Sequence, residues 1–266
     1  MGMLFNRLLI ILNEEDRNST NYHIALLMLE HIEDLQTMSI GQLAALCDVS
    51  KSTVSKFIRY IGYEDFSDFR YAAVFRDNKY RNDFNYATNV MEYIAQNSLD
   101  SYLLTVLQDI TATYQSLDWA SIDRLVDDLV QYRHVGAFGL MFSETAALDF
   151  QTKMCYLKKF IVTNINDVKQ EQFIEQAGED TLIIVFSDSG EFLDKYIRIP
   201  DFLNKTAFSK TRAKVVVITS NPKVQDDPRV AYTILYQKTR SMTTHRIVYG
   251  ILTDIIAYKY RERTHA

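Results

Sequence analysis

A basic stretch near the start of the chain has residue types that could bind phosphate groups. Residues 49–63 hold Lys51, Lys56 and Arg59 and no acidic side chain, although acidic residues outnumber basic ones over residues 1–80. Lysine and arginine neutralise the phosphates of nucleic acids, and neighbouring serine and threonine hydroxyls can hydrogen-bond to phosphates or base edges. The chemistry that this stretch could do is therefore nucleic-acid binding.

A second set of glycine and serine residues follows apolar runs in the C-terminal half. Gly139 and Ser143 come after residues 135–138, and a Ser-Asp-Ser-Gly sequence at 187–190 comes after the apolar run 181–186. Free backbone amides and hydroxyls at the start of a helix bind anions. We therefore expect a phosphate-type ligand at Gly139, Ser143, Ser187, Ser189 and Gly190. The alternative is that these residues only form turns and cap helices.

The histidines and cysteines lack the spacing of a metal site. No two of the five histidines stand at metal-ligand spacing, and Cys47 and Cys155 are far apart. The glycines complete neither a dinucleotide-binding motif nor a P-loop, and residues 187–190 lack the leading glycine of a nucleophile elbow. We expect no metal, no cofactor and no disulfide framework.

The elements that must position the basic stretch are helices. Apolar residues recur at helical spacing over 24–35, and Ser39 with Gln42 forms a capping box. A new helix then starts, with Ser50 as its N-cap and Gly62 as its end, and Asp48 lies in the short turn before it. Two short helices joined by a tight turn are typical of a helix-turn-helix. A plain helical bundle with a solvated polar face is the alternative.

The second of these helices has two distinct faces. Val54, Phe57, Ile58 and Ile61 are three or four residues apart and are expected to face inward. The opposite face is small, polar and basic, which suits serines that read base edges and cations that reach phosphates. The residues expected to contact DNA are Lys51, Ser52, Thr53, Ser55, Lys56 and Arg59.

The pattern changes to alternating strands and helices from about residue 119. Apolar runs predict strands at 135–139, 160–162, 181–187, 214–219 and 232–236, and the chain closes with a helix over 241–261. Ser143 is expected to cap a helix that runs to about residue 156. Such alternation favours a parallel sheet in a three-layer α/β sandwich, whose ligands bind beyond the carboxyl ends of the strands.

Length and composition limit the possible classes of protein. The chain has 266 residues, 47% of them hydrophobic, with a formal net charge of -5. It has no apolar run long enough to span a membrane and no secretory signal at its start, so we expect a cytoplasmic protein without membrane contact. The predicted division is a DNA-binding domain over 1–77, connecting helices over 78–118, and an α/β effector and oligomerisation domain over 119–266.

Taken together, these patterns resemble the RpiR-type transcriptional regulators, which join an N-terminal helix-turn-helix domain to a C-terminal SIS (sugar isomerase) domain. The resemblance spans nearly the whole chain and is most specific at residues 43–44, 49–57, 61–63 and 66–70. The loop at 187–190 is similar to the SIS phosphate loop, and the spacing of Arg246 and Asp254 is similar to that in the family's closing helix. It implies a regulator of sugar or amino-sugar metabolism that binds operator DNA and a sugar-phosphate effector, as a homodimer or homotetramer.

The chain departs from the family pattern at two bulky residues of the effector loops. Met141 stands where the first loop usually has a second glycine, and Phe192 stands where the second loop usually has a threonine. One alternative is therefore a degenerate SIS domain that only oligomerises. A phosphosugar isomerase is the enzymatic alternative, with Glu144, Asp188, Glu191 and His245 as the groups available for proton transfer. We expect a regulator and not an enzyme.

Overall fold

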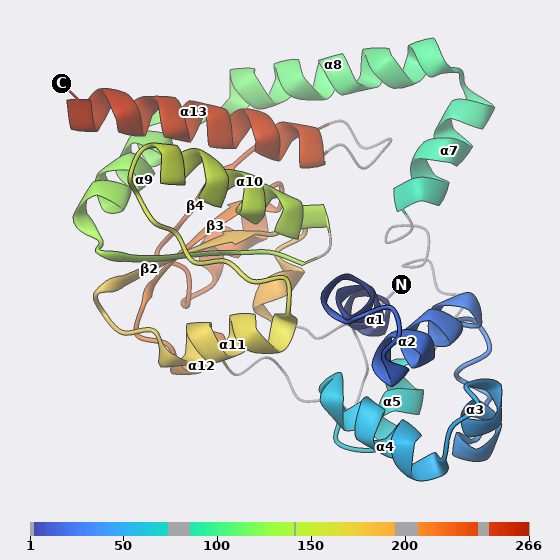
Figure 1. The fold of residues 1–266 in the computed structure, drawn as a ribbon. Helices are drawn as coiled ribbons and strands as arrows, with labels where there is room; N and C mark the ends of the chain where they lie inside the picture. Colours follow the sequence, from blue (N-terminus) through green and yellow to red (C-terminus); the bar gives the residue numbers. More distant parts are fainter. Residues whose placement is uncertain (1–2, 74–85, 141, 195–206, 239–244, 266) are drawn as a thin grey trace. The chain divides into compact units, whose positions relative to one another are not determined.

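The computed structural model describes residues 3–73, 86–140, 142–194, 207–238 and 245–265. The chain forms two compact units, Met1–Asn85 and Tyr86–Ala266. Figure 1 draws the first in blue and cyan and the second in green to red. The finer division at residues 77 and 118 stays a prediction.

The N-terminal unit is built from helices that begin at polar caps. Ser19, Ser39, Ser50 and Asp65 each accept a hydrogen bond from a backbone amide in the first turn that follows, and Ser39 with Gln42 completes the expected capping box. The helices described in this unit are α1 (Met3–Glu14), α2 (Thr20–Glu30), α3 (Ile40–Leu46), α4 (Lys51–Tyr60) and α5 (Phe66–Ala72).

The turn between α3 and α4 depends on a left-handed residue. Asp48 has φ 50°, a region that aspartate tolerates better than most residues, and the amide of Val49 donates to the carbonyl of Ala44 at 2.9 Å. At the other end of α4, Gly62 has φ 89° and the amide of Tyr63 donates to the carbonyl of Ile58 at 3.1 Å. Both ends of α4 are therefore fixed as the sequence predicts.

The C-terminal unit is built around a parallel sheet. Its described strands are β1 (His134–Phe138), β2 (Thr181–Phe186), β3 (Lys214–Thr219) and β4 (Tyr232–Leu235), and they lie side by side in that order, all parallel. Every residue of β2 is buried. Ile184 packs into one core cluster and Ile183 into the other, because successive side chains of a strand point to opposite faces. The sheet is thus covered on both sides.

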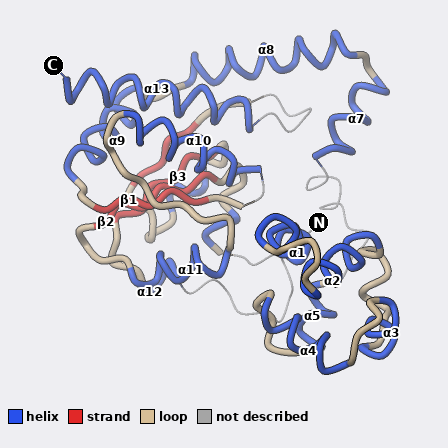
Figure 2. The backbone as a smooth tube through the Cα atoms, viewed as in Figure 1, coloured by secondary structure: helices blue, strands red, loops and turns tan. Residues whose placement is uncertain are grey.

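The helices form the two outer layers of a three-layer sandwich, which confirms the predicted fold class. In Figures 1 and 2, α9, α10 and α13 cover one face, and α11 and α12 cover the other. None of the described helices has both the length and the apolar character that a bilayer-spanning helix needs. The helices described in this unit are α7 (Tyr86–Gln96), α8 (Leu99–Ser116), α9 (Trp119–Gln131), α10 (Phe142–Tyr156), α11 (Asp167–Gln176), α12 (Ala207–Lys210) and α13 (His245–His265), with the 3-10 helices η1 (Glu191–Leu193) and η2 (Pro222–Asp226).

Two predictions about this unit were wrong. Residues 160–162 do not form a strand: Val162 makes one bridge to Gly136 beside β1, and both Phe160 and Val162 are exposed. An apolar run predicts burial on both faces, but this one lies along the outer edge of the sheet. Ser143 does not cap α10 either, because the helix begins one residue earlier, at Phe142, and Ser143 lies within its first turn.

Candidate DNA-binding surface and effector site

The α4 helix presents the predicted polar face to solvent. Val54, Phe57 and Ile58 are buried in the helical core, so the helix cannot rotate without exposing them. The opposite side chains are accessible: Lys51, Ser52, Lys56 and Arg59 are exposed, and Thr53 and Ser55 are half-buried. The structure thus brings all six predicted contacts onto one short helix.

The hydroxyls on this face differ in their local hydrogen bonds. The Thr53 hydroxyl lies 2.9 Å from the Ser50 hydroxyl at the cap, and the Ser55 hydroxyl donates to the carbonyl of Lys51 at 3.1 Å. Both can still accept a hydrogen bond, since a hydroxyl has two lone pairs. Ser52 is exposed in the first turn of the helix. Among the hydroxyls of Ser52, Thr53 and Ser55, that of Ser52 therefore lies on the most exposed residue.

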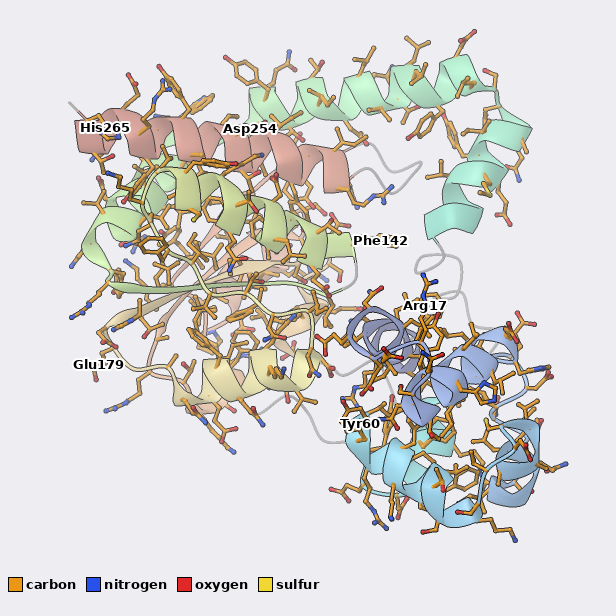
Figure 3. The ribbon with its side chains drawn as sticks, viewed as in Figure 1. Arg17, Tyr60, Phe142, Glu179, Asp254 and His265 are labelled. Atoms are coloured by element: carbon orange, nitrogen blue, oxygen red, sulfur yellow. The ribbon has the colours of Figure 1, made fainter. Side chains whose placement is uncertain are left out.

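The C-terminal end of α4 is tied to the first helix of the same unit. Tyr60, labelled in Figure 3, donates its hydroxyl to the Glu15 carboxylate at 2.7 Å. This bond lowers the pKa of Glu15 below its usual value and raises the pKa of Tyr60. Arg7 donates to the carbonyl of Gly62 at 3.0 Å and lies over the Tyr63 ring. These interactions hold α4 in place without using its outward-facing cations.

The loop after β2 uses its serines to hold its own backbone. Ser187 is buried and its hydroxyl accepts from the amide of Phe192 at 3.3 Å; the exposed Ser189 accepts from the amide of Glu191 at 3.3 Å. Gly190 has φ 80°, and a Cβ there would lie 2.3 Å from a Val224 methyl group. Ser187 and Ser189 therefore accept hydrogen bonds from backbone amides of the turn that follows, which is the alternative role that the sequence allows for them.

Gly139 and Ser143 lie against each other at the end of β1. A Cβ on Gly139 would come within 2.6 Å of the Ser143 backbone, so only glycine fits there. The Gly139 carbonyl accepts from the buried Gln170 side chain at 3.0 Å. Ser143 is buried in the first turn of α10, and α10 packs against α13. This packing places the first loop of the predicted effector site under the closing helix.

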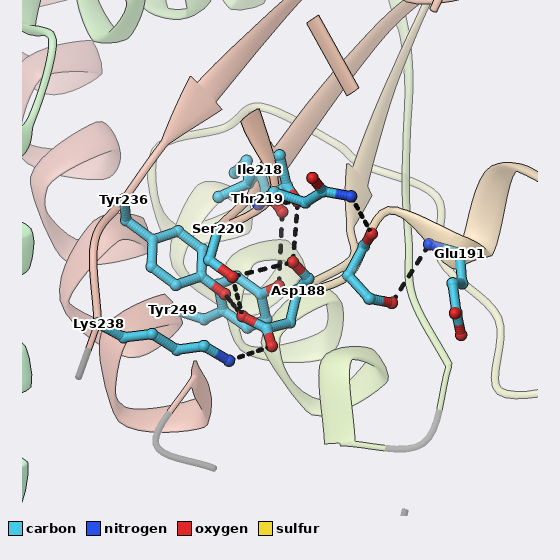
Figure 4. A network of polar contacts seen from close by, with 10 residues as sticks. Asp188, Glu191, Ile218, Thr219, Ser220, Tyr236, Lys238 and Tyr249 are labelled. Carbon is cyan, nitrogen blue, oxygen red and sulfur yellow. Dashed lines mark hydrogen bonds and ion pairs between the residues drawn. The ribbon is translucent and has the colours of Figure 1, made fainter. Parts of the chain in front are cut away.

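A polar network centred on Asp188 was not predicted as a unit. The Asp188 carboxylate accepts hydrogen bonds from Ser220 at 2.8 Å and from Tyr236, and it pairs with Lys238 (Figure 4). Burial raises the pKa of Tyr236 well above its usual value, so this phenol remains a hydrogen-bond donor. The sequence indicates Asp188 only as an available acid, because its partners come from the ends of β3 and β4.

A pocket lies between this loop and η2, and its lining is mixed in polarity and charge. Ser189 and Gly190 line it with the acidic side chains of Glu191, Asp194 and Asp227, and Lys223 adds one cation. Arg229 pairs with Asp194 and Asp227. Of the two bulky departures, Phe192 is buried and packs its ring edge-on against Phe208; Met141 lies outside the described residues. Phe192 therefore fills the core and does not project into this pocket.

Comparisons with known proteins agree with both units. Residues 7–75 match the helix-turn-helix domain of the rpiR family. Over its whole length the chain is 20% identical to a Providencia stuartii protein named "Uncharacterized HTH-type transcriptional regulator in aarA 3'region", covering 93% of it. It is 25% identical to the HTH-type transcriptional regulator HexR of Pseudomonas aeruginosa over 66% of this chain, which spans 61% of that regulator.

One solved structure has a similar fold over nearly the whole chain. The Vibrio vulnificus NanR protein, complexed with ManNAc-6P, superposes with a TM-score of 0.51 at 18% identity and covers 98% of this chain and 92% of its own. The N-terminal unit thus has the helix-turn-helix class of DNA-binding domain, and the C-terminal unit shares its α/β fold with NanR. Residues 7–75 of the N-terminal unit are a helix-turn-helix domain of the rpiR family, and the chain as a whole is similar to proteins named as HTH-type transcriptional regulators.

Proposed function

We propose that this regulator acts in the cytoplasm and reads operator DNA with the exposed face of α4. The observation that carries the proposal is the six-residue face itself: a capped helix, fixed by a buried apolar side, presents three cations and three hydroxyls. The cations, Lys51, Lys56 and Arg59, contact phosphates in this proposal. The hydroxyls, Ser52, Thr53 and Ser55, face base edges in the major groove. One such helix makes few contacts, so two copies on a palindromic site are expected.

Salt dependence tests the phosphate contacts before the operator is known. The probe is a short fluorescent duplex of mixed sequence, and the measurement is anisotropy at several salt concentrations. Lys56→Ala should weaken binding and reduce the slope of log affinity against log salt by about one, the value expected for a single phosphate that is no longer neutralised. Arg70→Ala is the matched control, because Arg70 is also an exposed cation of the same unit but lies on α5. A slope that changes equally in both variants contradicts the assignment to α4.

We further propose that the carboxyl edge of the sheet binds a sugar phosphate or amino-sugar phosphate. NanR, which shares the fold, is complexed with ManNAc-6P. In this chain Gly139, Ser143, Ser187, Ser189 and Gly190 gather at the ends of β1 and β2, where ligands of parallel sheets bind. The ligand would favour one placement of the DNA-binding units, and it can do so only by binding the two states unequally.

A thermal-shift screen against phosphorylated sugars and amino sugars tests this effector. A ligand at about a hundred times its dissociation constant stabilises the folded protein by roughly 2.7 kcal/mol. Ser189→Ala should abolish that response and leave DNA affinity unchanged, since the exposed Ser189 lines the pocket. If no compound shifts the melting temperature, the serine hydroxyls that already hold backbone amides favour the alternative, a SIS domain that only oligomerises.

A further inference from the structure

The short segment that follows β4 is held by side chains of helix α8. The buried Thr113 donates its hydroxyl to the carbonyl of Gln237 at 2.8 Å, and the amide of Gln237 donates to the Ser116 hydroxyl at 3.2 Å. Ser116 in turn donates to the carbonyl of Thr113 at 3.0 Å. Two side chains of α8 therefore satisfy both backbone polar groups of Gln237 and fix this residue to the end of the helix.

The residues on either side of Gln237 reach the loop after β2. Tyr236 donates its hydroxyl to the Asp188 carboxylate, and Lys238 pairs with the same carboxylate (Figure 4). The Tyr236 side chain is buried, and the side chains of Lys238 and Asp188 are each 23% exposed. A charge pair that is sheltered from water in this way is screened less by salt than a surface pair. Three consecutive residues thus join α8 on one side to Asp188 on the other.

Asp188 lies where a ligand of the loop would change its surroundings. It stands between Ser187 and Ser189, which belong to the proposed effector site. Its own carbonyl accepts from the Thr219 hydroxyl at 3.0 Å, which fixes the residue to the end of β3. A phosphate at the two serines would bring a second negative charge beside the Asp188 carboxylate. Because like charges compete for a cation that they share, the ion pair with Lys238 is the bond that such a ligand would weaken.

We propose that residues 236–238 couple the loop at 187–190 to helix α8. A change in the bonds of Asp188 alters how firmly residues 236 and 238 are held, and Gln237 between them then alters its bonds to α8. In chain order, α7 and α8 join the helix-turn-helix unit to the strands and helices of the sandwich. The coupling therefore links the effector loop to the segment that leads to the DNA-binding helices. The proposal rests on the proposed function in one respect, since the ligand of the loop is taken to be the effector.

A double-mutant cycle of Asp188→Asn and Thr113→Val measures the coupling by urea unfolding of the full chain. Thr113 bonds to Gln237, and Asp188 bonds to the residues on either side of it, so the two share no bond. Independent substitutions multiply the equilibrium constant for unfolding within about twofold, whereas this double variant should depart from the product of its single variants by more than about threefold. Thr111→Val is the matched control, because the exposed Thr111 donates within α8, to the carbonyl of Leu107 at 2.9 Å. Its effect should multiply with that of Asp188→Asn.

Amide hydrogen exchange gives a local measurement with a milder variant, which guards against a folding defect. Lys238→Gln removes only the cation from the Asp188 network. It should make the amides of residues 110–116 exchange at least about threefold faster and leave those of β2 unchanged, because the end of α8 opens locally. Asp194→Asn is the control: it breaks the ion pair with Arg229, and α8 should then exchange as in the wild type.

Two results overturn the coupling. One is a double variant of Asp188 and Thr113 that departs from the product of its single variants by threefold or less, in the sense of about 0.6 kcal/mol at most. The other is an α8 that exchanges in Lys238→Gln as it does in the wild type. Neither measurement uses a ligand or DNA. A coupling that is found while every phosphorylated sugar fails in the thermal-shift screen therefore overturns only the proposed effector.

Discussion

The two candidate sites handle their polar side chains in opposite ways. On α4 the cations point to solvent, and the helix is held by its buried apolar side and by bonds at its C-terminal end. In the loop after β2, Ser187 and Ser189 hold backbone amides, and the Asp188 carboxylate holds Tyr236 and Lys238. The exposed cations of α4 can therefore bind a ligand directly. The side chains of the loop after β2 must first give up their internal hydrogen bonds before they can bind a ligand. This contrast predicts that substitutions on α4 change binding, and that substitutions in the loop change stability.

The largest expected effect is at Gly190. Gly190→Ala forces a side chain into the left-handed region and against Val224, 2.3 Å from the added carbon. Strain and overpacking together should lower the free energy of unfolding by about 2–4 kcal/mol. Chemical denaturation measures this loss. Gly250→Ala in α13 is the control, because nothing lies within 4 Å of its new carbon, and it should be neutral or stabilising by up to about 1 kcal/mol. If Gly190→Ala and Gly250→Ala lower the free energy of unfolding equally, the claim that the loop has no room for a side chain at Gly190 is wrong.

The Asp188 network should produce the next largest effect. Asp188→Asn removes the charge that Lys238 and Tyr236 share, and hydrogen bonds to a charged group contribute about 1.5–3 kcal/mol. Asp194→Asn is the matched control: Asp194 also pairs with a cation, Arg229, but its side chain is 55% exposed, so the loss should be below about 1 kcal/mol. Both are measured by urea unfolding of the full chain. If Asp188→Asn and Asp194→Asn lower the free energy of unfolding equally, Asp188 does not stabilise the carboxyl edge of the sheet more than a surface ion pair does.

The sequence predicts the α4 surface well because the signals are local. Ser50, Asp48 and Gly62 each determine a feature within a few residues of themselves, namely a cap, a left-handed turn and a helix end. The buried and exposed faces then follow from helical spacing. All of this information lies in a stretch of about fifteen residues, so no tertiary contact is needed to interpret it.

The sheet edge is harder to predict because its partners are distant in sequence. The strands at 181–186 and 214–219 are evident from their apolar runs, but nothing near Asp188 indicates that Tyr236 and Lys238 reach it from the end of β4. The apolar run at 160–162 has the composition of a buried strand, and only its position at the edge of the sheet shows otherwise. Likewise, only the structure shows that α8 turns Thr113 inward.

A smaller effect separates stability from binding within α4. Ser50→Ala removes the N-cap that the amide of Thr53 uses and should cost about 1 kcal/mol of stability. Ser52→Ala, two residues later and exposed, should change stability by less than about 0.5 kcal/mol. In the duplex-binding assay without denaturant, Ser52→Ala should weaken binding to an operator selected from a library of random duplexes more than it weakens binding to mixed-sequence DNA. If Ser52→Ala destabilises the protein as much as Ser50→Ala, Ser52 is a structural residue and not a base contact.

The smallest effect concerns the bond between Tyr60 and Glu15, which supports α4 from outside its DNA-binding face. The Tyr60 hydroxyl is the main cause of the lowered pKa of Glu15, so Tyr60→Phe should raise that pKa toward its usual value. A lowered carboxylate pKa stabilises the folded state above the unfolded-state pKa, and this contribution is lost as the pH falls through the folded-state pKa. The variant should therefore lose part of the pH dependence of stability in the acidic range and keep its affinity for DNA near neutral pH. An NMR titration of Glu15 in both proteins measures the shift. An unchanged pKa would show that the Tyr60 hydroxyl does not bond to Glu15 in solution. A loss of DNA binding near neutral pH would instead place Tyr60 in the binding surface, against the separation between supporting and DNA-contacting residues on α4.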